Sequence, residues 1–195
     1  MRDGALAVVI GDVAGHGFGP ALLMAELRAY LRAFLWGHTD LGEILTLVNQ
    51  ALASDAPEGR FATLLLGRLD PPTRSFVYAS AGHTTGYLLD SSGTVKTLLR
   101  STGLPLAVLP ESTFAAAAPV PLEPGDMVLL ITDGIIEAHG ADQSLFGADR
   151  ALEVVRAHCS LAAREIVDTL YRAVRDFCGI RAQPDDMTAI LIKIE

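Results

Sequence analysis

The sequence predicts an α+β fold with antiparallel sheets, and two observations lead to this prediction. First, short apolar segments follow one another in runs while amphipathic segments come in pairs, whereas parallel sheets require the two kinds to alternate. Second, turn sequences such as "DPPTR", "DSSG" and "EPGD" separate the apolar segments. The chain has 195 residues, of which 50% are hydrophobic, so we expect it to bury the core of a single domain spanning residues 1–195.

Strands are predicted where a short segment is rich in Val, Leu, Ile, Phe or Tyr and is bounded by turn residues. Segments this short favour strands over helices, because a helix that buries an apolar face usually runs for about ten residues or more. The predicted strands are residues 5–11, 61–69, 74–80, 85–90, 94–99, 113–119, 126–132 and 187–194.

Helices are predicted where apolar residues recur three or four positions apart. Gly19 and Pro20 are a favourable helix entry, because proline at the first helical position loses no needed hydrogen bond. Asp40 and Ser160 are candidate caps for two further helices. The predicted helices are residues 20–36, 41–53 and 161–178, with a weaker one at 148–158.

The charge and composition of the chain limit the kinds of partner and location that we expect for it. The net charge of −8, with no cluster of basic residues, argues against nucleic acid as a partner. No apolar run approaches the length of a membrane span and no leader pattern is visible, so we expect a cytoplasmic protein without a membrane anchor. Cys159 and Cys178 lie in helical sequence without metal-ligand spacing, and we expect both to be buried free thiols.

Three aspartates stand at the ends of predicted strands: Asp12 in "VVIGDVAGHG", Asp133 in "LLITDGIIEA" and Asp185 in "QPDDMTAILI". Folding could bring them to one rim, where clustered carboxylates would need a cation to neutralise them. An all-oxygen ligand set suits Mg²⁺ or Mn²⁺ rather than zinc. The glycines after Asp12 would let backbone carbonyls approach the ion. For any one aspartate taken alone, the interpretation as an ordinary turn residue stays open.

Seven motifs in order give the chain a resemblance to a known family: "GDVAGHGFGPALLMAELRAYLR", "FATLLLGRLDP", "ASAGHTTGYLL", "TGLPLAV", "LEPGDMVLLITDGIIEA", "LFGADR" and "DDMTAILIKI". Together they resemble the SpoIIE/RsbU-like branch of the metal-dependent PPM (protein phosphatase 2C-like) serine/threonine phosphatases. The resemblance implies an αββα sandwich of two antiparallel sheets flanked by helix pairs. It also implies two Mn²⁺ or Mg²⁺ ions and a metal-activated water that attacks the phosphoserine or phosphothreonine directly.

The resemblance assigns roles to five positions. Asp12 matches the metal-bridging aspartate, which makes it a catalytic residue, and the carbonyl of Val13 matches the backbone ligand beside it. Asp133 and Asp185 match the carboxylates of the first metal. Asp186 is expected either to act as a ligand or to organise the loop next to the ligands.

Two histidines and one alanine are less certain matches. His16 is a candidate general acid, although a loop or phosphate-side role fits its position equally well. His83 either contacts metal or substrate or is a structural loop histidine. Ala107 in "GLPLAV" stands where the family usually has glycine.

The beginning of the chain departs from the family pattern. Family members carry a "GGDxxD"-type strand before the motif that contains Asp12, and that strand supplies a carboxylate to the second metal. This chain begins at "MRDGALAVVI", so we expect an N-terminally truncated domain with a weak second metal site. The strand at residues 5–11 would then present an unpaired edge, through which a homodimer could form.

Two functions of different classes follow. The first is a protein serine/threonine phosphatase of bacterial partner-switching or stress signalling, whose implied substrate is a phosphorylated STAS-type anti-sigma factor antagonist. The second is a non-catalytic binding module that keeps the fold but cannot build the metal pair. Retention of all three aspartates favours the enzyme.

Overall fold

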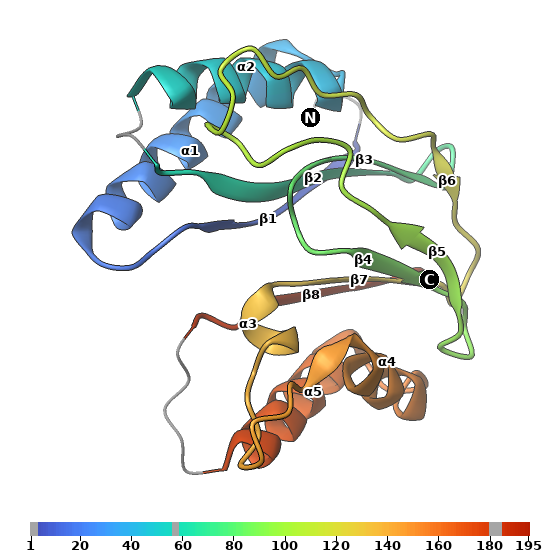
Figure 1. The fold of residues 1–195 in the computed structure, drawn as a ribbon. Helices are drawn as coiled ribbons and strands as arrows, with labels where there is room; N and C mark the ends of the chain where they lie inside the picture. Colours follow the sequence, from blue (N-terminus) through green and yellow to red (C-terminus); the bar gives the residue numbers. More distant parts are fainter. Residues whose placement is uncertain (1–3, 56–58, 180–184) are drawn as a thin grey trace. The chain divides into compact units, whose positions relative to one another are not determined.

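The computed structural model describes residues 4–55, 59–179 and 185–195. The chain divides into two compact units, here called the first unit (Met1–His83 with Arg100–Leu122) and the second unit (Thr84–Leu99 with Glu123–Glu195). Each unit contains one antiparallel four-stranded sheet and its own helices (Figure 1). The predicted α+β class with antiparallel sheets is confirmed.

The first unit is built on a sheet with the strand order β1-β2-β3-β6. The strands are β1 (Leu6–Val13), β2 (Ala62–Asp70), β3 (Ser75–Ala81) and β6 (Val120–Pro121). Helices α1 (Phe18–Gly37) and α2 (Leu41–Asp55) cover one face of this sheet (Figure 1). Along β1 and β2 alternate side chains point to that face, and Val13, Ala62 and Leu64 pack there in a core with Leu27 and Leu45 of the helices.

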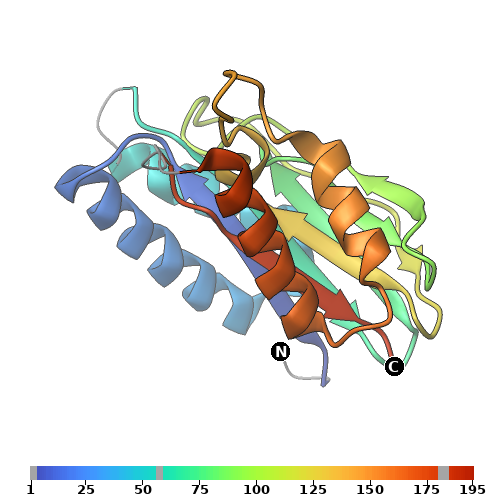
Figure 2. The same cartoon turned by 90° about the horizontal axis from the view of Figure 1, so that it is seen from below.

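The second unit has the strand order β5-β4-β7-β8. Its strands are β4 (Gly86–Leu89), β5 (Val95–Leu99), β7 (Met127–Ile131) and β8 (Ala189–Lys193). Its helices are α3 (Asp133–Ile136), α4 (Gly147–Ala157) and α5 (Ala163–Cys178). Figure 2 shows α4 and α5 side by side across the sheet. Every residue of β7 is buried, as expected for an interior strand.

One predicted strand is wrong. Residues 113–119 form no strand, and the chain pairs with β3 only at Val120–Pro121. The main chain before that point is held elsewhere: the Phe114 N–H donates to Thr46 Oγ1 of α2 at 2.9 Å, and the Ala117 N–H donates to Tyr78 O at 2.7 Å. Its apolar composition therefore reflects packing and not a sheet ladder.

Of the two predicted helix caps, Asp40 is confirmed and Ser160 is wrong. Asp40 caps α2, because its Oδ1 accepts the N–H of Glu43 at 2.8 Å. Ser160 does not cap α5, which begins at Ala163; there the Glu165 carboxylate accepts the N–H of Ala162 at 3.1 Å. The short helix α3 was not predicted at all.

Two further expectations concern cysteines and membranes. Cys159 and Cys178 are both free, and Cys178 is buried in the core of the second unit, as predicted. The prediction that Cys159 is buried is wrong, because this residue just after α4 is only partly covered. Of the helices in the described residues, none combines the length and the apolarity needed to cross a membrane.

Candidate metal centre

The first unit places Asp12 at the end of β1, directly opposite Thr63 of β2. Residues directly opposite each other in an antiparallel pair project from the same face of the sheet. Asp12 and Thr63 therefore share the face that points away from α1 and α2. The next pair, Val13 and Ala62, lies in the helix-facing core, so the side chain of Val13 is not available for binding and the role of its carbonyl stays a prediction.

His83 lies beside this position, whereas His16 does not share its environment. The Oγ1 of Thr63 and the Nδ1 of His83 are 3.0 Å apart, and the His83 side chain is only 4% exposed. His83 thus contacts the strand partner of Asp12 and is held in place by burial. His16 is exposed on the loop that follows β1 and is open to solvent.

The loop after Asp12 depends on glycine. Gly15 and Gly17 both have a φ of 92°, a left-handed conformation that costs other residues energy. Opposite the loop, the Ala14 N–H donates to Phe61 O at 3.0 Å, which extends the β1–β2 pairing by one step. Arg60, the residue before Phe61, reaches back over this loop. A Cβ on Gly19 would lie 3.1 Å from Arg60 Nη2, and one on Gly15 would lie 3.9 Å from Nη1.

The sequence pattern does not identify Arg60 as a candidate functional residue. Its only signal is its place one residue before the predicted strand at 61–69. That place becomes informative once this strand is known to pair with the strand that carries Asp12.

The second unit brings Asp133 next to the segment that carries Asp185 and Asp186. Thr132, the last residue before α3, makes three bonds across to this segment. Its N–H donates to Thr188 O at 3.0 Å, its hydroxyl donates to Asp186 O at 3.2 Å, and the same oxygen accepts the N–H of Thr188 at 3.0 Å. These bonds continue the β7–β8 pairing, which places Ile131 opposite Ala189.

Gly134 lets the two segments approach this closely. A Cβ at this position would overlap the carbonyl oxygen of Asp186 and would lie 2.9 Å from its carbonyl carbon. A side chain cannot be accommodated without moving the main chain that carries Asp185 and Asp186.

The carboxylates of Asp133 and Asp185 keep one oxygen each for binding. Oδ1 of Asp133 accepts the N–H of Gly134 at 3.0 Å, and Oδ1 of Asp185 accepts the N–H of Asp186 at 2.8 Å. Within the described residues, Oδ2 of each has no hydrogen-bond partner, and neither side chain forms an ion pair. One oxygen of each carboxylate thus accepts a main-chain hydrogen bond, while the other could bind a hard divalent cation, which prefers oxygen ligands.

The predicted ligands come from both units. Asp12 belongs to the first unit, whereas Asp133, Asp185 and Asp186 belong to the second. Over residues 4–55, 59–179 and 185–195, no three His, Cys, Asp or Glu side chains are grouped closely enough to hold a metal ion. The ligand set therefore stays a prediction.

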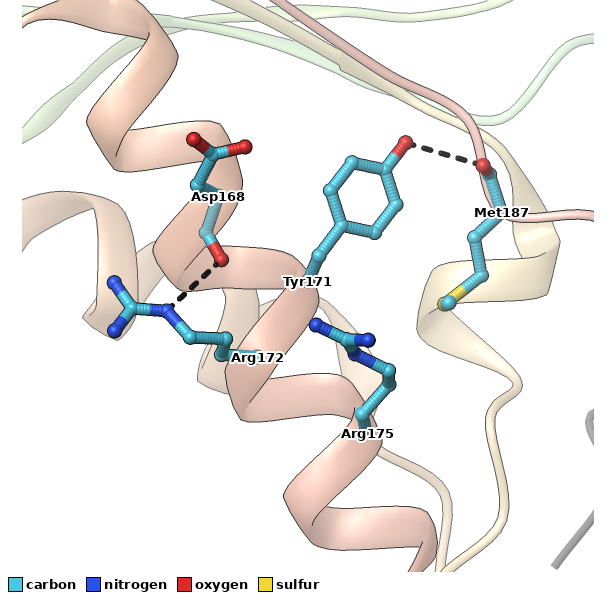
Figure 3. Close-up of a pocket in the computed structure, with 5 residues that line it drawn as sticks. All are labelled: Asp168, Tyr171, Arg172, Arg175 and Met187. Carbon is cyan, nitrogen blue, oxygen red and sulfur yellow. Dashed lines mark hydrogen bonds between the residues drawn. The ribbon is translucent and has the colours of Figure 1, made fainter.

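A pocket of about 410 Å³ lies between α5 and the chain that enters β8 (Figure 3). It is lined by Asp168, Tyr171, Arg172, Arg175 and Met187. Figure 3 shows Tyr171 pointing from α5 toward Met187, and its hydroxyl donates to Met187 O at 3.1 Å and accepts the N–H of Ala189 at 3.2 Å. Tyr171 therefore anchors the main chain immediately after Asp185 and Asp186.

The fold defines the class of the protein. The structure resembles the SiaA-PP2C domain of Pseudomonas aeruginosa with a TM-score of 0.84 and 23% sequence identity, covering 99% of this chain and 81% of that one. The chain thus has the fold of a PP2C-type phosphatase domain.

Sequence comparison identifies the family. The family model described as "Stage II sporulation protein E (SpoIIE)" matches residues 2–195, and the chain therefore belongs to the SpoIIE family. It is 30% identical to Protein IcfG of Synechocystis sp., over 98% of this chain and 34% of that protein. It is 24% identical to Phosphoserine phosphatase RsbU of Bacillus subtilis, over 95% of this chain and 55% of RsbU. The chain spans about half the length, or less, of these relatives. The resemblance to the SpoIIE/RsbU-like branch is confirmed.

Proposed function

We propose that this chain is a metal-dependent protein serine/threonine phosphatase of bacterial signalling. The observation that carries the proposal is the pair of strand-end carboxylates in the second unit, Asp133 and Asp185. Thr132 ties their segments together, and each carboxylate keeps an oxygen available within the described residues. Membership of the SpoIIE family and the similarity to a phosphoserine phosphatase support a phosphorylated serine or threonine as the group that is hydrolysed.

The donor atoms fit a hard divalent cation. Asp12, the Val13 carbonyl, Asp133 and Asp185 offer only oxygen, which suits Mn²⁺ or Mg²⁺. When bound, such an ion would lower the pKa of a water and neutralise charge on the phosphoryl oxygens. The Asp186 carbonyl accepts the Thr132 hydroxyl, so in our proposal Asp186 mainly orients the loop that presents Asp185.

The two histidines receive different roles. His16 is exposed on the loop after Asp12, and we assign it the delivery of a proton to the departing serine oxygen. His83 is buried against Thr63, and we assign it the support of the strand pair that holds Asp12. A His16→Gln substitution should therefore reduce turnover of a phosphoserine protein more than turnover of p-nitrophenyl phosphate, whose leaving group needs no proton.

We further propose that the substrate is a STAS-type anti-sigma factor antagonist and that the phosphatase works in the cytoplasm. Both points follow from the resemblance of the sequence motifs to the SpoIIE/RsbU-like branch and from the composition of the chain. We propose that the second ion binds more weakly than the first, because the residues predicted to bind metal supply carboxylates mainly to the first.

Self-association through β1 is part of the same proposal. β1 pairs with β2 on one side, and no strand of the described residues pairs with its other side. Leu6 and Val9 of this strand are 54% and 37% exposed. An edge of this kind can pair with a second copy. Light scattering should show a dimer that is lost when Ala7 is replaced by proline, since proline cannot donate to a ladder; a monomer at high concentration would contradict it.

A hydrolysis assay tests the function. The purified chain should hydrolyse p-nitrophenyl phosphate and a phosphoserine protein when Mn²⁺ is present and not when it is chelated. Asp12→Asn should reduce turnover by about a hundredfold or more. Asp176→Asn, which changes an exposed aspartate on α5, should retain it. A folded wild-type chain without turnover in Mn²⁺ or Mg²⁺ would instead favour a non-catalytic binding module.

A further inference from the structure

The side chain of Arg60 occupies an unusual place in the first unit. It lies across the glycine loop that follows Asp12. A Cβ on Gly19 would meet its Nη2 at 3.1 Å, its Cζ at 3.2 Å and its Nη1 at 3.6 Å. The guanidinium therefore covers the main chain of the first turn of α1 at a point where a larger residue would push it away. Glycine at position 19 has no left-handed backbone to explain its presence, so room for Arg60 is its evident role.

The charge of Arg60 has no partner among the residues that the structure describes. Within the described residues, its guanidinium forms none of the four ion pairs and none of the hydrogen bonds. Other arginines are engaged: Arg68 donates to Thr39 O at 3.0 Å and Arg150 donates to Phe146 O at 2.9 Å. Arg60 is also only partly exposed, and its guanidinium packs against the loop at Gly19.

The register of β1 and β2 connects Arg60 to Asp12. The Ala14 N–H donates to Phe61 O at 3.0 Å, and Asp12 lies opposite Thr63. Arg60 therefore lies at the same end of the β1–β2 pair as the carboxylate of Asp12. A guanidinium presents several donors in one plane and binds phosphate oxygens two at a time, which lysine cannot do.

We propose that Arg60 contacts the phosphoryl group of the substrate and positions it at Asp12. The proposal rests on the proposed function and names the residue that recognises the dianionic phosphate monoester from the side of the glycine loop. Gly19 keeps the space that the guanidinium needs, because a Cβ there would lie 3.1 Å from Nη2. Arg60 takes no part in bond breaking, so it affects binding of substrate and of inorganic phosphate more than the rate of the bound complex.

Kinetics of three variants test the proposal, with Arg32→Ala on the exposed part of α1 as the matched control. Arg60→Ala should raise the KM for a phosphoserine protein and the inhibition constant of inorganic phosphate about tenfold, with a smaller change in kcat. Arg60→Lys should recover part of the loss. Gly19→Ala should give the same pattern more weakly, because its Cβ displaces the guanidinium. Arg32→Ala should match the wild type, and the melting temperature of all variants should stay close to that of the wild type.

A second readout does not need turnover. Inorganic phosphate with Mn²⁺ should protect Arg60, but not Arg32, from modification by phenylglyoxal, as followed by mass spectrometry of the peptides. If the wild type hydrolyses phosphoserine while Arg60→Ala behaves like Arg32→Ala, the assignment of Arg60 is wrong and the proposed function stands. If the wild type shows no turnover but phosphate protects Arg60, the phosphate contact stands and the proposed function fails. Equal modification of Arg60 with and without phosphate overturns the contact.

Discussion

The two halves of the candidate metal centre are built in different ways. In the second unit, Asp133 and the Asp185 segment are joined by three hydrogen bonds of Thr132 and by the close packing at Gly134. In the first unit, Asp12 ends an edge strand and is followed by a loop with two left-handed glycines. The segments of the second unit are therefore joined by side-chain and main-chain contacts, whereas the position of Asp12 depends on β1–β2 pairing and on the backbone freedom of the glycine loop.

The largest effect should come from filling the contact at Gly134. A Gly134→Ala substitution must move the main chain of Asp186, since its Cβ would lie 2.9 Å from that carbonyl carbon. We expect the free energy of unfolding to fall by about 3 kcal/mol and metal-dependent activity to be lost. Urea unfolding followed by circular dichroism measures the first, and the phosphatase assay measures the second.

Gly37→Ala is the matched control, because a Cβ at Gly37 meets nothing within 4 Å. It should leave stability unchanged or slightly raised, as alanine favours helices. If both alanine variants behave alike, the second-unit half is not held by close packing and the contrast between the halves disappears.

Removal of the Thr132 hydroxyl should have the next largest effect. Thr132→Val keeps the shape of a side chain that is 3% exposed but leaves the Thr188 N–H and the Asp186 carbonyl without their partner. The expected loss is about 2 kcal/mol of unfolding free energy, together with weaker Mn²⁺ binding. Thr132→Ser keeps the hydroxyl and should restore most of the metal affinity. Equal Mn²⁺ affinity in the valine and serine variants would show that the hydroxyl does not position the ligands.

Tyr171 of α5 also holds the chain that follows Asp185, so removal of its hydroxyl is a further test of the second unit. Tyr171→Phe removes a hydroxyl that bonds Met187 O and the Ala189 N–H, directly after the Asp185 segment. We expect a loss of about 1 kcal/mol and a several-fold weaker Mn²⁺ affinity, measured by calorimetry. A Tyr30→Phe variant of the first unit, whose hydroxyl donates to Asp55, should leave the metal affinity unchanged. If the two variants have the same effect on affinity, α5 does not support the site.

Much of the fold could be predicted from the sequence, because periodicity and turn residues are local signals. They placed seven of the eight strands and both long helices of the first unit within a few residues. The failures come from tertiary contacts: residues 113–119 look like a strand, yet their N–H groups bond Thr46 and Tyr78. Such partners are distant in sequence and leave no local pattern.

The residue types of the candidate site could be predicted from the sequence, but their arrangement in space could not. Asp133 and Asp185 could be placed at strand ends, yet their proximity depends on β7 pairing with β8, which are more than fifty residues apart. Arg60 could not be identified from sequence, because its importance depends on the β1–β2 register and on the direction of its side chain.

The smallest effect is expected in the first unit, at Ala107. This residue has a φ of 66°, a conformation that glycine adopts at lower cost, and its N–H donates to the buried Asn49 at 2.8 Å. Ala107→Gly should raise the free energy of unfolding by about 0.5–1 kcal/mol, because relief of strain outweighs the greater entropy of the unfolded glycine chain. A thermal melt measures it. A lower melting temperature would show that the loop holds alanine without strain.

The most direct test of the metal centre is a calorimetric titration with Mn²⁺ of the wild-type chain, Asp133→Asn and Asp176→Asn. Our account predicts at least one site in the wild type, a weakening of about tenfold or more in Asp133→Asn, and no change in Asp176→Asn. Identical binding by the wild type and Asp133→Asn, or no binding by a folded wild type, would contradict the account.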